Sequence, residues 1–503
     1  MDHIKGAEKY KIVFVDRILD PVHGFIDLTE VESEIVKLPI FKRMQSLKQL
    51  SLTNWVFPGA EHTRYMHSLG VMHIADMMAV NLWDVQNGCA RYNDGERQLL
   101  RLAGLLHDIG HYPLSHLTEQ VYNMPLEEES NTLFSHNKDI KERIDALEKA
   151  QSKIPDYMKD RSSKPLHHES VGATVIRHDQ QIREIIAKYC PFIDIEDICS
   201  IIIGCVDRNP QIAAMVQLLH SELDADGIDY VMRDATFSGT SYGGFELGLL
   251  LRNLRVTSYG SGIEVVGVRP KGISVVDQYL ISKYFAYTQV IFNRHVAIFE
   301  EMAVLFSKAL LSQLGSPYPR QKSLVRIAET HEQNDQFLRF TDRTFWSQLD
   351  EKARENMGGL VDEYLLKIHD RLQHYQEFDM SDNGEIIITS SEKPKIVQTL
   401  RESDIYQRLL RQNEDRLTLY HERGFTSQIR EDDFRRVLRE QFKNDSHERL
   451  EEKFVKYNEK RLQEGIAVID EQKPLHLLAD DSRSIMSHLY STKTHILREY
   501  IVA

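Results

Sequence analysis

The chain has 503 residues, of which 42% are hydrophobic and 27% charged, and it carries a net charge of −14. This composition indicates a globular protein of roughly two to four domains and excludes a disordered chain. The negative charge excludes a general nucleic-acid or anionic-membrane binder, so nucleic acid is not an expected partner. The four cysteines lack C-x-x-C spacing, which argues against a structural zinc site, and nothing suggests a disulfide framework. We find neither a signal peptide nor a membrane span and expect a cytoplasmic protein.

The first part of the chain is predicted to be helical after a short hairpin. The elements expected are a β-hairpin within 10–30, two helices between 30 and 50 divided by Pro39, a loop over 51–60, a helix over 61–86 and an apolar helix over 99–106. Arg64 and His67 are three residues apart, so they share one helix face and can reach the same site.

A histidine-rich stretch follows the apolar helix. His107 and Asp108 are adjacent, and His111 lies four residues after His107, on the same face if the helix persists. Gly110 and Pro113 indicate that the helix ends nearby and leaves the imidazoles at its terminus, facing a cleft. Imidazole beside carboxylate suits a divalent metal ion. The alternative is a helix end with buried, hydrogen-bonded histidines.

The middle of the chain adds a charged excursion and a second acidic stretch. Residues 124–165 predict an exposed helical insertion, which is either a lid or subunit contact or simply solvated. Apolar helices are expected within 192–222. Polar residues then recur at one helical face, which is either solvated or turned to a cleft: Asp226, Asp229, Tyr230, Arg233 and Asp234.

The last part combines a second hairpin with long helical segments. Residues 254–268 predict a hairpin, and 275–311 predict one long helix that carries Lys283 and Arg294. From 315 onward the chain is charged and helical, with one short strand at 385–389. This region carries no motif that we can connect with chemistry, so we expect an α-rich lobe for structure, assembly or regulation.

The residues that could bind a metal ion form a recognisable set. His67, His107, Asp108 and Asp226, in this order on three helices, resemble the signature of the HD-domain phosphohydrolases. The flanking residues, at 57–60, 64–70, 105–116 and 223–234, are similar to those of the HD-type deoxynucleoside triphosphate triphosphohydrolases. The resemblance spans about residues 35–305. It implies a mainly α fold: an N-terminal hairpin segment (1–30), an HD helical core (31–312, with the insertion at 124–165) and an α-rich C-terminal lobe (313–503).

The resemblance also implies roles for individual residues. The metal ligands would be His67, His107, Asp108 and Asp226, holding Mn²⁺, Mg²⁺, Fe²⁺ or Zn²⁺. The catalytic group would be His111, His168 and Glu119, where the family has a shorter Asp in place of Glu119. The substrate would be bound by Arg64, Tyr230, Lys283 and Arg294 at its phosphates, by Gln49 and Asp234 at the sugar 3′-hydroxyl, and beside Leu50 at the C2′ edge.

The activity implied is metal-dependent hydrolysis of a deoxynucleoside triphosphate (dNTP) to deoxynucleoside and inorganic triphosphate. The alternatives are an HD phosphohydrolase for another nucleotide and a catalytically silent nucleotide sensor. The family also implies a homo-oligomer, tetramer or hexamer, and an allosteric nucleotide. Gly227 stands where some relatives have a phosphate-binding lysine. Lys37 and Gln45 do not match the activator site of the human relative, so activation by GTP is not implied.

Overall fold

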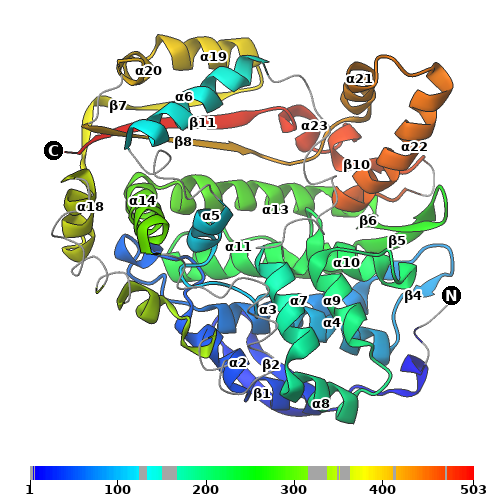
Figure 1. The fold of residues 1–503 in the computed structure, drawn as a ribbon. Coiled ribbons are helices and arrows are strands. Elements are labelled where there is room, and N and C mark those ends of the chain that lie inside the picture. Colours follow the sequence, from blue (N-terminus) through cyan, green and yellow to red (C-terminus); the bar gives the residue numbers. More distant parts are fainter. Residues whose placement is uncertain are drawn as a thin grey trace.

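The structure of the protein, a computed structural model, confirms a mainly α fold (Figure 1). It describes residues 4, 6–123, 133–149, 167–314, 337–347, 351, 363–411, 415–470 and 473–502. Within these ranges no helix has both the length and the apolar character needed to cross a bilayer. All four cysteines are free thiols.

The N-terminal hairpin forms where the sequence predicts it and leads into the helical core. Its strands are β1 (Phe14–Asp20) and β2 (Gly24–Thr29). The core helices are α1 (Glu30–Ile35), α2 (Pro39–Lys42), α3 (Arg64–Asn81), α4 (Asp94–Leu106), α5 (His116–Asn123), α7 (His168–His178), α8 (Gln180–Tyr189), α9 (Ile195–Ile203), α10 (Ala213–His220), α11 (Ala225–Ser238) and α12 (Leu247–Arg252). Helix α3 packs against α4 and α11, and α9 packs against α4 and α7. This packing brings the ends of α4, α7 and α11 together.

The helix that leads to the His107-Asp108 pair ends too early to include both His107 and His111. Helix α4 stops at Leu106, and 107–110 form a turn, so His107 and His111 are not on one helix face. Leu114 and Ser115 both adopt left-handed backbone, at φ 55° and 53°. Side-chain-bearing residues avoid this region unless surrounding contacts impose it. A tight loop, rather than a helix, therefore presents these histidines.

The predicted helix over 275–311 is wrong as a single element. Helix α13 (Ile273–Phe285) passes into a π-helical segment (Ala286–Ile291), and α14 (Arg294–Leu314) follows. The Phe292 amide donates to the carbonyl of Tyr287, five residues earlier, at 2.7 Å. This wider turn is typical of π-bulges at functional sites, and hydrophobic periodicity alone does not reveal it.

The C-terminal part contains more β-structure than the one short strand that the sequence indicates. Strands β7 (Asp379–Ser390), β11 (Lys493–Ile501) and β8 (Arg416–Gly424) form an antiparallel sheet in that order. In Figure 1, α6 (Leu133–Lys149), α19 (Lys393–Glu402) and α20 (Asp404–Leu409) cover one face of the sheet, and α13 and α14 lie beneath the other. This sheet is therefore a layer on the core helices.

The predicted insertion is not simply exposed. Helix α6 buries Ile140 and Ile144 in an apolar cluster with β8, β11, α19 and α20. The His136 ring lies 2.8 Å from the Thr418 carbonyl on β8. Residues 124–132 and 150–166 of the predicted insertion lie outside the described residues.

A second, mixed sheet lies at the other end of the molecule. Its order is β10 (His476–Leu477), β9 (Ala467–Val468), β6 (Ile263–Val268), β5 (Leu254–Tyr259), β3 (Trp83–Asp84) and β4 (Cys89–Ala90). The β5–β6 pair is the hairpin that the sequence predicts. Further α-helices are α18 (Glu363–Gln373), α21 (Glu431–Gln441), α22 (His447–Glu464) and α23 (Met486–Leu489).

Candidate active site

A cavity of about 910 Å³ lies where the core helices meet the end of β8. Its volume is within the usual range of small-molecule sites. Most of the substrate residues that the sequence predicts line it: Gln49, Leu50, Arg64, Tyr230, Asp234 and Lys283. Arg294 does not line it. Its side chain is exposed at the start of α14, with Nε 3.0 Å from Nε2 of His295.

Four side chains of the predicted metal set meet at one edge of the cavity. His67 comes from α3, His107 and Asp108 from the turn after α4, and Asp226 from the first turn of α11. Ligand atoms of the first three lie within 4.8 Å of one another. His67 Nε2 is 2.9 Å from Asp226 Oδ1 and 3.8 Å from Asp108 Oδ2. Two imidazoles and two carboxylates surrounding one point are a donor set for a divalent ion.

In both His67 and His107, Nδ1 contacts an oxygen of the protein, so Nε2 is the nitrogen that faces the other predicted ligands. His67 Nδ1 lies 2.7 Å from Asp229 Oδ2, and His107 Nδ1 lies 2.8 Å from the Gly104 carbonyl. His107 Nε2 is buried and has no hydrogen-bond partner among the described residues. Metal-binding histidines characteristically donate their second N–H to a carboxylate or carbonyl. These residues therefore fit a metal ion.

The charges of the cluster also favour a cation. Burial by itself would raise the pKa of Asp108, but Arg64 and the neighbouring imidazoles hold it well below its usual range. Burial opposes ionisation of Asp226 too, yet His67 lowers its pKa to about 2. In return, the carboxylates of Asp226 and Asp229 raise the pKa of His67 to about 10 against the effect of burial. The site thus attracts positive charge, which a divalent ion would supply.

Asp229 is the residue of this cluster to which sequence reasoning assigned no role. Its carboxylate contacts His67 and His23 and pairs with Arg233, whose Nε is 2.8 Å from Asp229 Oδ2. The predicted single polar face of α11 is therefore divided. Asp226 and Tyr230 face the cavity, while Asp229 and Arg233 are fully buried behind His67. Asp229 lies about one helical turn after the predicted metal ligand Asp226, and this spacing could have indicated its place beside the metal cluster.

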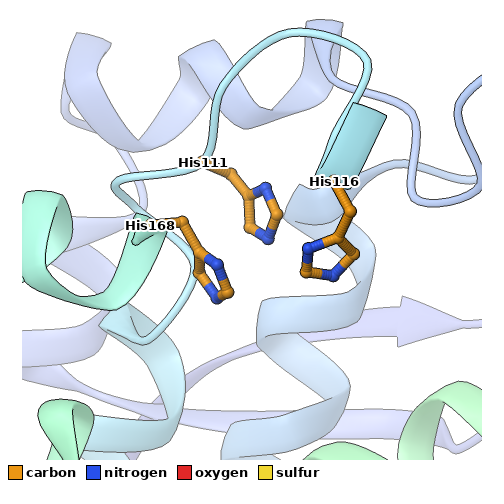
Figure 2. A group of neighbouring side chains, drawn as sticks. All are labelled: His111, His116 and His168. Atoms are coloured by element: carbon orange, nitrogen blue, oxygen red, sulfur yellow. The ribbon is translucent and has the colours of Figure 1, made fainter. Parts of the chain in front are cut away.

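A second group of imidazoles lies directly beside the metal cluster. Figure 2 shows the rings of His111, His116 and His168 turned toward one another. The His111 and His168 rings stack with their centroids 4.0 Å apart. Glu119 Oε2 lies 3.2 Å from His168 Nδ1 and 3.0 Å from His116 Nδ1. The structure thus brings the predicted catalytic residues together and adds His116 to them. The H-x₄-H spacing between His111 and His116 is the sequence feature that could have indicated this residue.

The pKa values of the two stacked imidazoles, His111 and His168, are shifted in opposite directions. Burial, Arg64 and His168 hold the pKa of His111 well below its usual value. Burial acts in the same direction on His168, but hydrogen bonding to Glu119 raises its pKa. Neighbouring groups whose pKa values are driven apart are typical of acid–base sites. Of the two rings, His168, which lines the cavity, is the one whose protonated form is favoured by its surroundings.

Two side chains at another wall of the cavity can form hydrogen bonds with a ligand. Gln49 Oε1 is buried and has no hydrogen-bond partner among the described residues. Asp234 Oδ1 lies 2.8 Å from His62 Nε2, a fully buried ring, so this carboxylate is held in one orientation. An acceptor without a partner and a fixed carboxylate suit a ligand that carries a hydroxyl group.

The structure also explains why glycine stands at 227. A Cβ there would lie 2.3 Å from the Tyr279 hydroxyl, so no longer side chain fits. It would lie 3.4 Å from Lys283 Nζ, so the Lys283 side chain fills the space beside this glycine. Burial opposes the charge on Lys283, but Tyr279 and Asp224 raise its pKa. Lys283 on α13 is thus a permanent cation in the cavity.

Comparison with known proteins agrees with this geometry. The HD-domain family model matches residues 64–212, which include three of the four metal-type residues. The uncharacterized protein YwfO of Bacillus subtilis is 30% identical over 275 residues, 54% of this chain and 51% of the relative. The chain therefore spans about half the length of that relative. The human deoxynucleoside triphosphate triphosphohydrolase SAMHD1 is 41% identical over 102 residues, 20% of this chain and 16% of that protein.

Solved structures share the fold. A hypothetical protein from Aquifex aeolicus superposes with a TM-score of 0.62 at 23% identity, covering 97% of this chain and 96% of that one. A phosphohydrolase from Bacteroides thetaiotaomicron gives 0.56 at 18% identity, covering 96% and 99%. Residues 64–212 thus match the HD domain, and the His67, His107 and Asp108 cluster lies within this segment.

Proposed function

We propose that the protein hydrolyses deoxynucleoside triphosphates to deoxynucleoside and inorganic triphosphate. The observation that carries this proposal is that one cavity is lined by three of the predicted metal ligands, by cationic side chains and by side chains that could bind a sugar hydroxyl. The partial similarity to SAMHD1, whose name states this activity, supports the substrate class. Gln49 and Asp234 would bind the 3′-hydroxyl, and Leu50 and Tyr230 would close the C2′ edge against a ribose hydroxyl.

Charge balance supports a polyphosphate substrate. The carboxylates of Asp108 and Asp226 would repel a polyanion, so cations have to offset them. Arg64 lies in the same cavity, with Nη1 2.7 Å from Asp108 Oδ2, and Lys283 supplies a second cation. A divalent ion held by the four predicted ligands would add Lewis acidity and positive charge at the phosphate.

The histidine group can manage the proton of the leaving group. In the proposed reaction water attacks the α-phosphorus and the bond from phosphorus to the 5′-oxygen breaks. His168, whose proton is stabilised by Glu119, would donate a proton to the departing 5′-oxygen. Stacking on His111 keeps the His168 ring in place.

Substrate profiling tests the proposal. Purified protein with Mn²⁺ or Mg²⁺ is given each dNTP singly and in mixtures, with ATP and GTP as controls. We expect turnover of dNTPs that is lost in His107→Ala, with an unchanged circular dichroism spectrum. Turnover only in mixtures would indicate an allosteric nucleotide. We also propose that the protein assembles into a tetramer or hexamer, and light scattering tests this. Equal turnover of ribonucleotides would contradict the role of the C2′ edge.

A further inference from the structure

The end of strand β8 places one arginine in the active-site cavity. We propose that Arg423, from the C-terminal part of the chain, binds the phosphate tail of the substrate together with Lys283. This inference rests on the proposed function, because it assigns a residue to the substrate's phosphates. No motif at this position suggests such a role, and sequence reasoning connected this part of the chain with no chemistry.

Arg423 is a cation for which the described residues supply no carboxylate at ion-pair distance. It lines the cavity, and its guanidinium carbon lies 3.6 Å from the centroid of the Tyr287 ring. Its Nε is buried and donates to no acceptor among the described residues, and the ion pairs of these residues include none with Arg423. The adjacent Glu422 pairs instead with Lys493. A partly buried guanidinium with a buried Nε–H that has no acceptor is a donor group that a phosphate would satisfy.

Secondary structure fixes the position of Arg423. It pairs with Thr494 of β11, and the Thr494 hydroxyl lies 2.6 Å from the Tyr284 hydroxyl on α13. The Phe425 ring stacks on the Tyr284 ring at 4.0 Å. The end of the C-terminal sheet is thus docked on the helix that carries Lys283. The π-helical segment that follows brings Tyr287 under the guanidinium.

A buried carboxylate holds the chain beyond Arg423. Glu222, two residues before the α11 cap at Asp224, accepts hydrogen bonds from the Thr426 hydroxyl at 2.7 Å and from the Ser427 amide at 2.6 Å. Gln428 Nε2 donates to the same carboxylate at 2.8 Å. These bonds connect the segment after β8 to the start of the helix that carries Asp226, so Arg423 is held in fixed relation to the metal cluster.

Electrostatics favours a shared anion between the two cations. Burial opposes the charge on Lys283, and the positive charge of Arg423 acts on the pKa of Lys283 in the same direction. Asp224 partly offsets Lys283, whereas Arg423 forms no ion pair with a carboxylate of the described residues. Two cations facing one cavity repel each other, and an anion with several charges relieves this repulsion. An inorganic triphosphate moiety has that chemistry.

The test compares Arg423→Gln with Arg439→Gln, which removes the same charge from an exposed position on α21 outside the cavity. We measure kcat and KM for a dNTP and the Kd of inorganic triphosphate by calorimetry. Losing one charge-assisted phosphate contact is expected to raise KM and this Kd about tenfold, with kcat changing less. Arg423→Lys is expected to restore part of the affinity, and Arg439→Gln to match wild type.

The outcomes separate this inference from the proposed function. Wild-type KM and Kd values in Arg423→Gln would overturn the role of Arg423 while leaving dNTP hydrolysis intact. Equal weakening of deoxynucleoside monophosphate and triphosphate binding would also overturn it, because a tail contact affects only the longer phosphate. If the wild-type protein turned over no dNTP, the proposed function would fail, and the triphosphate Kd would still decide the role of Arg423.

Discussion

At the scale of single residues, the site depends on which nitrogen of each imidazole is already occupied. His67 and His107 each direct one nitrogen to a protein acceptor and the other to the shared point. Fixing the tautomer in this way prepares the ring for a metal before the metal arrives. Asp229 is therefore as much a part of the metal site as a residue that would contact the ion, although it acts through His67.

Replacing Asp229 tests this positioning role. We expect Asp229→Asn to weaken Mn²⁺ affinity about 10- to 100-fold, because the amide no longer stabilises the His67 Nδ1–H as the carboxylate does. Isothermal titration on folded protein measures the affinity. Asp20→Asn is the matched control, since Asp20 pairs with the same Arg233, at 2.8 Å, without contacting His67. Equal loss of affinity in both variants would show a merely structural effect of the Arg233 pairs.

At the scale of elements, the site depends on how two helices are held. Helix α4 presents His107 and Asp108 at its end, and a buried ion pair connects it to α1. Arg101 Nη2 lies 2.6 Å from Glu32 Oε2, and Arg101 Nη1 lies 2.9 Å from Asp76 on α3. Burial opposes the charge on Glu32, but Arg101 lowers the pKa of this carboxyl below its usual value.

This ion pair predicts a pH dependence of stability. Because the pKa of Glu32 is lower in the folded protein than the unfolded value of about 4.3, the unfolded chain binds more protons as pH falls through that value. The pair therefore contributes its full stabilisation above pH of about 4.3, and this contribution declines as pH falls from there through the lower pKa of Glu32 in the folded protein. We expect Glu32→Gln to destabilise the protein by about 3–5 kcal/mol at pH 7 and by less at pH 3.5.

Urea unfolding at both pH values measures this effect. Glu34→Gln is the control on the same helix, because Glu34 makes an exposed pair with Lys37. That variant is expected to change stability by less than about 1 kcal/mol. A Glu32→Gln deficit of the same size at both pH values would refute the linkage.

The contact between the 107–115 loop and α7 depends on a glycine. A Cβ at Gly110 would lie 2.2 Å from the Gly172 amide nitrogen and 2.3 Å from the His168 carbonyl. Because both are backbone atoms, α7 would have to move and take His168 away from Glu119. We expect Gly110→Ala to cost about 1–3 kcal/mol of stability and to lower kcat more than Mn²⁺ affinity.

Steady-state kinetics and metal titration measure the two effects. Gly248→Ala serves as the control, because nothing lies within 4 Å of a Cβ at that exposed helical position. A Gly110→Ala enzyme with wild-type kcat would mean that the close approach of α7 does not matter for catalysis.

At the scale of the whole molecule, the cavity is assembled from parts far apart in the chain. Its walls include Gln49 near the N-terminus, Asp226 in the middle and Arg423 on the C-terminal sheet. The predicted boundary at 312 thus divides residues that share one cavity. For this reason the C-terminal part is expected to be needed for activity, and not only for assembly.

The sequence predicted the helical character and both hairpins, because periodicity and turn residues are local properties, and the family resemblance supplied the predicted site residues that line the cavity. It did not predict the π-helical segment or the sheet around β11, because the strands of that sheet pair over long distances and are set by tertiary contacts. It assigned phosphate binding to Arg294, which is exposed, and none to Arg423. The difference arises from the break in the helix after α13, which turns Arg294 away from the cavity.

The most direct test of the central proposal is product identification in ¹⁸O-labelled water. A dNTP is incubated with the protein and a divalent ion, and the products are separated by ion-exchange chromatography and analysed by mass spectrometry. We predict two products, unlabelled deoxynucleoside and inorganic triphosphate with one ¹⁸O, because water attacks the α-phosphorus. Release of pyrophosphate or orthophosphate, or label in the deoxynucleoside, would contradict the proposed reaction.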